Sequence, residues 1–269
     1  GRPGESGIQG TTYLTREFSL GTVNRGDFWN QRRPLLGFWG GAARPARYLG
    51  LRVIKDGYDF SSALFFSVQK ENCVLGLINF RNPGGDRHIS LDPIKDGQFK
   101  AGRLFAEFDF EGFEADWRHE FNGDALTLDA PALGAWLHVR GGRFGRFPAR
   151  MNVAKASNSL VATVDLLPEG GPHTIRWSGT PEAWAAFTLA LCPSGKNVPE
   201  FARQCREAPF RLERQGNAIL LDWDSPAGRL ELEGGAAPAP AETQNALFRE
   251  RIHGQPVAPV RISETRLAG

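Results

Sequence analysis

The chain has 269 residues, of which 41% are apolar and 23% charged, so it can bury a sizeable core and is not expected to be disordered. Its 32 basic and 30 acidic residues leave a formal net charge of +2, which argues against nucleic acid or an anionic membrane as partner. The three cysteines, Cys73, Cys192 and Cys205, contain no CxxC pair, so neither a zinc site nor a disulfide framework is expected. The alternative to three free cysteines is one disulfide bond between Cys192 and Cys205.

A Gly-rich lead-in covers residues 1–10, and short segments of alternating apolar and polar residues follow it. The alternation predicts strands over residues 11–23, 32–40, 46–55, 60–69, 73–80, 87–91, 98–110, 113–121, 124–129, 134–140, 159–166, 172–178, 183–192, 208–214, 217–223 and 227–233. The run NPGGD at 82–86 predicts a turn, and the stretch 143–156 is less regular. Helices are predicted over 198–206, with Asn197 as the N-cap, and over 242–252.

This pattern predicts an all-β fold: a large antiparallel β-sandwich, supersandwich-like, with one or two short helices. Strands and helices do not alternate, which disfavours a doubly wound sheet or a TIM barrel, and no fixed-period repeat indicates a propeller. We expect three parts, namely the lead-in 1–10, the sandwich 11–233, and a C-terminal part 234–269 whose linker, short helix and last strand pack on the sandwich.

The most regular alternation lies at residues 103–121, which we predict to form a hairpin. One face of its first strand is apolar, and the other carries Glu107, Asp109 and Glu111. Two carboxylates can act as acid and base in glycoside hydrolysis, which makes Glu107 and Asp109 candidate catalytic residues. A carboxylate cluster can also bind Ca²⁺, and the simplest alternative is a solvated outer face of a sheet. Neither a P-loop nor an HExxH motif is present, so we expect no cofactor and no metal.

His138 lies in the segment AWLHVRGGRFGRF together with three arginines, Arg140, Arg143 and Arg146. An imidazole and a tyrosine such as Tyr13 or Tyr48 can move a proton beside a carboxylate that arginines neutralise, which is the chemistry of a lyase acting on uronic acids. His138 and Tyr13 are therefore further candidate catalytic residues. A structural histidine on a strand is the alternative, and the charge balance argues against a nucleic acid on this basic and aromatic segment.

Residues 11–41 form the stretch that is densest in aromatic side chains and arginines. Such side chains suit a sugar-binding groove, because a sugar ring has an apolar face and many hydroxyls. The alternative is that Trp29 and Trp39 seal an interface between two sheets or against another domain. The predicted ligand contacts are Trp29, Arg32, Arg33, Trp39, Arg140, Arg143 and Arg146.

The segments TTYLTREFSLGT and NQRRPLLGFWG resemble the strand that opens the β-sandwich after an (α/α) toroid in heparinase-type and related bacterial polysaccharide lyases. The resemblance implies an all-helical domain before a large sandwich, with catalysis in the cleft between them. No helical toroid lies within the 269 residues, so it implies a sandwich that lacks half of an active site.

We therefore expect a carbohydrate-associated accessory module, not catalytic on its own, located outside the cytoplasm. Its expected partners are a polysaccharide or oligosaccharide and another protein domain, not nucleic acid or a membrane. The alternatives are a polysaccharide lyase or glycoside hydrolase, and a structural assembly domain.

Overall fold

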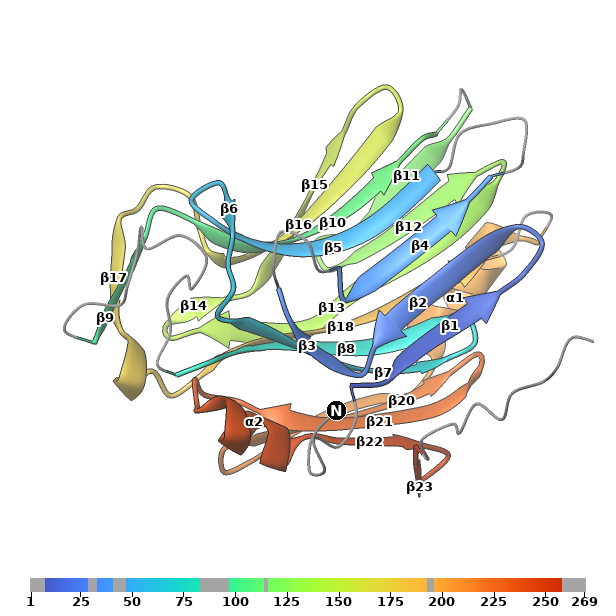
Figure 1. Ribbon diagram of the computed structural model, residues 1–269. Coiled ribbons are helices and arrows are strands. Elements are labelled where there is room, and N and C mark those ends of the chain that lie inside the picture. The colour runs from blue at the N-terminus through green and yellow to red at the C-terminus, as the bar shows by residue number, and fades with distance from the viewer. Residues whose placement is uncertain are drawn as a thin grey trace, which may run out of the picture.

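The alternating segments form three stacked layers of antiparallel strands in the computed structural model (Figure 1). The structure describes residues 8–28, 33–40, 47–82, 97–113, 116–192 and 196–257. Sheets I and II form a sandwich, and a smaller sheet III covers the other side of sheet II. The predicted fold class, an all-β antiparallel sandwich with short helices, is confirmed.

Sheet I is exposed on one of its faces. Its strands, in order across the sheet, are β1 (Gly10–Leu14), β2 (Phe18–Val23), β4 (Leu35–Trp39), β5 (Arg47–Lys55), β10 (Leu104–Glu111), β16 (Ser159–Leu167) and β15 (Arg150–Lys155), and β6 (Tyr58–Asp59) pairs with β5. Buried and partly exposed residues alternate along β2, β10 and β16. Because successive side chains of a strand point to opposite faces, one face of this sheet lies in the core and the other meets solvent.

Sheet II is covered on both faces. Its strands, in order, are β11 (Arg118–Phe121), β12 (Ala125–Ala130), β13 (Leu133–Phe144), β18 (Ala183–Cys192), β8 (Cys73–Phe80), β7 (Ala63–Lys70) and β3 (Arg25–Asp27), and β14 (Phe147–Pro148) pairs with β13. Strands β8 and β18 are buried at every position. Continuous apolar runs such as AWAAFTLALC are typical of strands with both faces covered.

Sheet III is built from the last strands of the described chain. Its strands, in order, are β19 (Phe210–Gln215), β20 (Ala218–Ser225), β21 (Gly228–Gly235), β22 (Arg249–Ile252) and β23 (Gln255–Pro256). Helix α1 (Val198–Glu207) precedes this sheet, and α2 (Ala241–Leu247) links β21 to β22. A two-stranded pair, β9 (Gln98–Ala101) with β17 (His173–Arg176), and the 3₁₀ turn η1 (Trp177–Gly179) lie at one end of the sandwich. None of the helices in the described residues is long and apolar enough to cross a membrane.

Two hydrophobic cores separate the three layers. Between sheets I and II, Phe108 meets Phe187 edge to face, with 4.8 Å between ring centroids. Between sheets II and III, Trp136 stacks on Trp223 with 6.0 Å between centroids. Burial of apolar surface stabilises at about 25 cal/mol per Å², so these two cores are the main source of stability for the layers.

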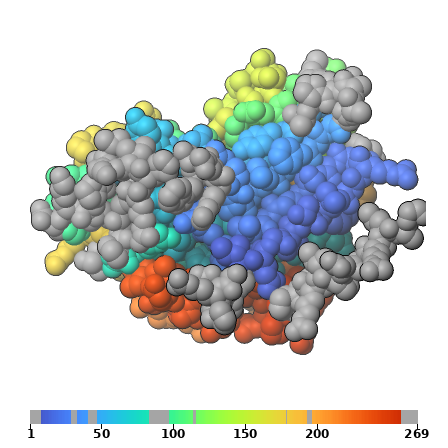
Figure 2. All heavy atoms as spheres, viewed as in Figure 1, coloured from blue at the N-terminus to red at the C-terminus, as the bar shows by residue number. Residues whose placement is uncertain are grey.

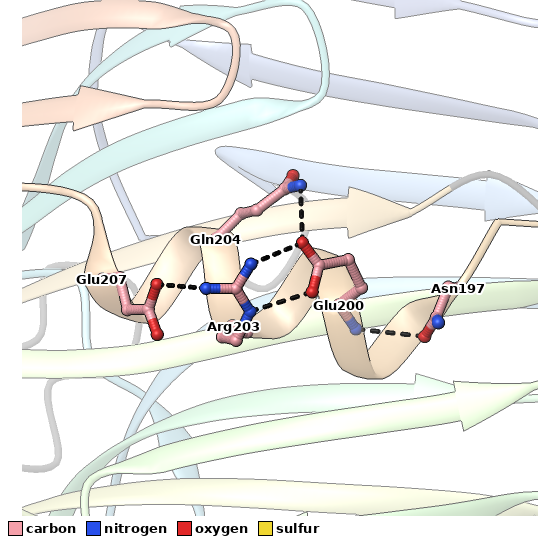
Figure 3. Close-up of polar contacts among 5 residues, drawn as sticks. All are labelled: Asn197, Glu200, Arg203, Gln204 and Glu207. Carbon is pink, nitrogen blue, oxygen red and sulfur yellow. Dashed lines mark hydrogen bonds and ion pairs between the residues drawn. The ribbon is translucent and has the colours of Figure 1, made fainter.

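Helix α1 packs against sheet II next to sheet III. The predicted N-cap is confirmed, since the Asn197 side chain accepts a hydrogen bond of 3.1 Å from the backbone N–H of Glu200. On the solvent side, the Arg203 guanidinium lies 2.7 Å from Glu200 and 2.5 Å from Glu207 (Figure 3). Solvent screens such exposed pairs, so the helix is held mainly by its buried face, which includes Ala202.

Buried polar bridges connect elements that are far apart in the sequence. The Asn24 side chain, at the end of β2, donates a hydrogen bond of 2.9 Å to Glu250 of β22. Asn79 of β8 donates a hydrogen bond of 3.0 Å to Gln244 of α2, and Gln244 in turn donates one of 2.9 Å to the carbonyl of Phe80. Sheet III is therefore fastened both to the middle of sheet II and to the first strands of the fold.

Some predicted details are wrong. The hairpin at 103–121 does not form, because β10 pairs with β5 and β16 whereas β11 pairs with β12 in the other sheet. The helix predicted over 242–252 ends at Leu247, and the less regular stretch 143–156 contains β14 and β15. Strands β19 to β21, expected within the sandwich, form a sheet of their own with β22 and β23. The predicted strand 87–91 and most of the turn 82–86 lie outside the described residues.

All three cysteines are buried free thiols, so the alternative of a bond between Cys192 and Cys205 is not realised in this structure. Burial raises the pKa of Cys192 to about 11 and that of Cys73 to about 12. Thiols with such pKa values are unreactive at neutral pH, so these side chains act as small apolar groups of the core.

Candidate functional site

The outer face of sheet I is a broad open surface of the sandwich. Sheet II is enclosed between sheet I and the layer formed by sheet III and α1, whereas the outward side chains of β10 are partly exposed. In the space-filling view the blue residues of the first strands lie at the surface, above the orange and red residues of the C-terminal part (Figure 2). Side chains on this outer face can therefore meet a ligand without any rearrangement of the layers.

Two aromatic side chains from neighbouring strands lie together on this face. Phe38 of β4 is 42% exposed and lies opposite Tyr48 of β5, with 6.1 Å between the ring centroids. The end of the Tyr48 side chain fills the space that a side chain at Gly50 would need, so the missing side chain lets the phenol lie along the sheet. Gly50 is directly opposite Asp109 of β10, which brings the Tyr48 hydroxyl next to a carboxyl group.

Arg52 of β5 links two further carboxylates beside this pair. Its Nε lies 2.9 Å from Oδ1 of Asp59, and one terminal nitrogen lies 3.8 Å from Oε1 of Glu107. The hydrogen bond to Asp59 raises the pKa of Arg52, and burial raises the pKa of Glu107. Arg52 is thus a fixed cation between two acceptors on the open face.

Asp109 lies two residues beyond Glu107 on the same strand and face. Burial is the main cause that raises its pKa to about 7, and the hydrogen bond to Glu111 and the charges of Glu111 and Glu107 act in the same direction. Arg52 opposes the shift. A protonated carboxyl group can donate as well as accept a hydrogen bond, so Asp109 is able to do both near neutral pH.

A second arginine and aromatic ring continue the face past Glu107. The Arg103 guanidinium lies 4.2 Å from the centroid of the Phe105 ring and 2.8 Å from Oδ1 of Asp165. Asn152 donates a hydrogen bond of 2.8 Å to the other oxygen of Asp165. Aromatic rings therefore lie on both sides of the charged groups of β5 and β10.

The outer-face site is made of five side chains: Phe38, Tyr48, Arg52, Glu107 and Asp109. It combines flat apolar surface with hydrogen-bond donors and acceptors that are already held in place. An arrangement of this kind can bind a polyhydroxylated ring, and its carboxyl pair can exchange protons.

Of the predicted ligand contacts near the N-terminus, Trp39 points into the core. It is 3% exposed and stacks on Phe113 with 5.8 Å between centroids, so it does not offer its ring to a ligand at the surface. This position fits the alternative of packing between sheets. Arg33 lies just before β4 and is partly exposed, and Trp29 and Arg32 lie outside the described residues.

The candidate lyase residues are not brought together. Tyr13, on β1 of sheet I, packs against the first core and has its ring centroid 6.1 Å from that of Phe18. His138 lies on β13 of sheet II, with its ring 5.4 Å from that of Trp136 in the second core. The two side chains therefore belong to different layers and cannot act on one substrate in this fold.

The contacts of Arg140 are those of a structural residue that joins neighbouring elements. It donates a hydrogen bond of 3.0 Å to the Thr188 hydroxyl, and its guanidinium lies 5.0 Å and 4.6 Å from the ring centroids of Trp136 and Phe210. A further bond of 3.4 Å reaches the carbonyl of Cys205 on α1. These partners come from sheet II, sheet III and α1, so Arg140 fastens three elements to one another.

The other two arginines of the predicted patch lie at the far end of β13. Arg143 pairs with Glu182 at 3.3 Å, and Glu182 also binds Arg214 of sheet III. Arg146 follows β13 in the turn to β14, is exposed, and lies 4.9 Å from the centroid of the Phe147 ring. The predicted patch thus divides into a half-buried arginine that joins three elements, an ion pair and one open guanidinium.

We expect His138 to remain neutral well below neutral pH. Burial is the largest cause that lowers its pKa to about 4, and Arg140 adds to it, whereas Asp124 acts in the opposite direction. Because the folded pKa lies below the unfolded value of about 6.5, the unfolded chain binds more protons and His138 makes the fold less stable as the pH falls below that value. A ¹H–¹⁵N NMR titration should show no protonation of His138 above roughly pH 5. A midpoint near the unfolded value would contradict this burial.

The sequence analysis named Glu107 and Asp109 and considered Tyr48, but it named neither Phe38 nor Arg52 as a site residue. The sequence feature that could have identified Phe38 is an aromatic residue at a solvent-facing position of an alternating strand, since Phe38 is exposed in β4. The pairing of β4 with β5 and of β5 with β10 creates the site, and this pairing joins segments that are far apart in the sequence.

The fold and the outer-face site define an all-β protein of three antiparallel layers with an open polar and aromatic face. In the part of the chain that the structure describes, no group of three or more His, Cys, Asp or Glu side chains is arranged to hold a metal ion. No protein-family model, curated protein or solved structure matches the chain. The resemblance to the sandwich of polysaccharide lyases therefore stays a prediction.

Proposed function

We propose that this chain is a carbohydrate-associated β-sandwich module that holds a saccharide on the outer face of sheet I. The observation that carries the proposal is the position of the exposed Phe38 ring and the half-buried Tyr48 ring beside Arg52, Glu107 and Asp109 on one open face. A sugar ring has an apolar C–H face that packs on an aromatic ring, and its hydroxyls bond to charged donors and acceptors.

The charges of this face favour a neutral saccharide. Arg52 and Arg103 are the cations that act on Glu107, and Arg103 is already paired with Asp165. Around Arg52 lie the carboxyl groups of Asp59, Glu107, Asp109 and Glu111, so acidic groups outnumber cations here among the described residues. An anionic sugar would be repelled by the ionised members of this group, whereas hydroxyls can donate to them. The resemblance to polysaccharide lyases implies acidic substrates. The charge of the saccharide that binds therefore distinguishes the ligand expected from the resemblance from the neutral ligand expected from the charges of this face.

Replacing Phe38 with alanine should weaken saccharide binding at least about fivefold, because one ring–ligand contact is worth roughly 1 kcal/mol. The measurement is calorimetric titration with a panel of neutral and acidic oligosaccharides. Phe121→Ala is the matched control, since Phe121 is similarly exposed at 39% but lies on sheet II. The proposal is overturned if the wild-type protein binds no member of the panel, or if both variants lose affinity equally.

A second candidate, glycoside hydrolysis, is favoured by the proton that Asp109 holds near neutral pH. Glu107 and Asp109 are alternate residues of one strand, so both carboxyl groups lie on the same outer face of the sheet, and glycosidases use a pair of carboxyl groups as acid and base. In this mechanism Asp109 would protonate the leaving oxygen and Glu107 would activate a water.

Release of reducing sugar from the bound oligosaccharide tests the hydrolase. Asp109→Asn should abolish release and leave binding within about threefold, because the amide keeps the hydrogen-bonding shape of the neutral acid. If the wild-type protein binds but releases no sugar, the non-catalytic module stands and the hydrolase is rejected.

A further inference from the structure

A cavity of about 370 Å³ opens at the end of the sandwich where β14 and β17 lie. It is lined by residues from the turn after β13 and from the start of β17, namely Gly145, Arg146, Phe147, Pro172, His173, Thr174 and Ile175. Its volume is at the lower end of the range for small-molecule sites, about 300–1,000 Å³. None of these lining residues is acidic, which is the reverse of the outer-face site.

Arg146 brings an open positive charge to this cavity. Its guanidinium lies 4.9 Å from the centroid of the Phe147 ring, and among the described residues no carboxylate lies within ion-pair distance of it. The nearby Arg143 differs, because it is paired with Glu182. A guanidinium that stacks on a ring keeps the N–H groups at its edge free. These N–H groups can donate two parallel hydrogen bonds to a carboxylate.

His173 adds a second polar group whose orientation is fixed. Its Nε2 lies 2.8 Å from the carbonyl oxygen of Pro168. A carbonyl only accepts hydrogen bonds, so Nε2 carries the proton and Nδ1 is left for another partner. The imidazole also meets the Phe147 ring edge to face, with 4.8 Å between centroids.

The rest of the lining is apolar and compact. Phe147 and Ile175 pack against the first core, and Pro172 contributes a rigid ring. On β17, Thr174 is directly opposite Lys100 of β9, so a second cation lies close to the lining. Flat apolar walls under a free guanidinium fit a ligand that has a ring-shaped body and one planar anionic group.

We propose that this cavity, the Arg146 pocket, binds a small ring-bearing carboxylate, with the Arg146 guanidinium on the carboxylate and the ring against Phe147 and Pro172. The pocket is separate from the outer-face site and does not depend on it. Its ligand is either a sugar acid or an aromatic acid, which share the carboxylate and differ in the ring.

The test titrates the whole chain with three probes, glucuronate, benzoate and inorganic phosphate, at low ionic strength and follows binding by calorimetry. Arg146→Gln should weaken binding of the carboxylate that the wild-type protein prefers by about 10- to 100-fold, the usual effect of losing a charge-assisted pair. Arg150→Gln is the matched control, because Arg150 is also exposed but does not line the pocket, and it should bind like the wild type.

Phe147→Leu separates recognition of the ring from attraction of any anion. It should weaken the ring-bearing probe several-fold and leave phosphate unchanged, because only the ring contacts the aromatic wall. The proposal is overturned if the wild-type protein binds neither carboxylate, or if Arg150→Gln loses as much affinity as Arg146→Gln. It is also overturned if phosphate binds as tightly as both carboxylates and Phe147→Leu changes nothing, since the site would then select charge alone.

Discussion

Replacing Arg140 with alanine should lower the free energy of unfolding by about 2–4 kcal/mol. The substitution removes contacts with the rings of Trp136 and Phe210 and the hydrogen bonds to Thr188 and α1, and each such contact is worth roughly 0.5–2 kcal/mol. Burial lowers the pKa of Arg140 to about 10, so part of this gain is offset by the cost of desolvating its charge. Urea denaturation of the wild-type and variant proteins measures the difference.

Two further variants sharpen the test of Arg140. Arg143→Ala should cost less than about 1 kcal/mol, because Arg143 is 47% exposed and Glu182 keeps its bond to Arg214. Arg140→Met retains the apolar stem and should recover part of the stability lost in the alanine variant. If Arg140→Ala is as stable as Arg143→Ala but loses saccharide binding, Arg140 is a ligand contact and not a structural residue that joins neighbouring elements.

The second large effect is a dependence of stability on pH through Asp109. Its pKa is about 7 in the folded chain against an ordinary value of 3.8, so between these values the folded state holds a proton that the unfolded state has released. The stabilising contribution of Asp109 is therefore complete below about pH 4 and is lost as the pH rises through 7. Because the side chain is partly open to solvent, we expect about 1–2 kcal/mol and not the full value of the shift.

Asp109→Asn isolates this contribution, because the amide cannot titrate. Unfolding free energies at about pH 4.5 and about pH 7.5 should show the wild-type protein losing about 1–2 kcal/mol more than the variant on going to the higher pH. His138 contributes with the opposite sign and is common to both proteins, so it cancels in the comparison. Equal pH dependence of the two proteins would mean that Asp109 is ionised in the folded state at neutral pH.

The positions of the strands were largely readable from the sequence because alternation reports local burial. Strand β10 carries an apolar residue at every second position, and the structure buries that set and exposes Glu107 and Asp109. The continuous apolar runs of β8 and β18 contained the further information that a third layer exists, since a strand needs cover on both faces to be apolar throughout.

Alternation did not predict which strands pair with each other. The segment after β10 alternates as a hairpin partner should, yet its strand β11 pairs with β12 in the other sheet. Alternation fixes the face of each residue and leaves the choice of partner to long-range packing. For the same reason the outer-face site could not be predicted from alternation. Phe38, Tyr48 and Asp109 come together only because β4 pairs with β5 and β5 pairs with β10.

The three arginines predicted to form one ligand-binding patch do not lie together in the structure. Arg140, Arg143 and Arg146 are close in sequence, but β13 is long and carries them to different surroundings. The long apolar stem of arginine allows burial between aromatic rings as well as exposure at a ligand site, and the sequence does not distinguish these cases.

The bridge between Asn24 and Glu250 has a consequence for how the chain is made. A growing chain on the ribosome exposes the strands around Asn24 long before β22, which carries their partner, has been synthesised. Strand β8 must likewise wait for β18, which follows much later. Folds dominated by such distant pairings assemble slowly, and their unpaired apolar edges are vulnerable to aggregation in the meantime. We therefore expect nascent chains of this protein to be most prone to aggregation before β22 has been synthesised.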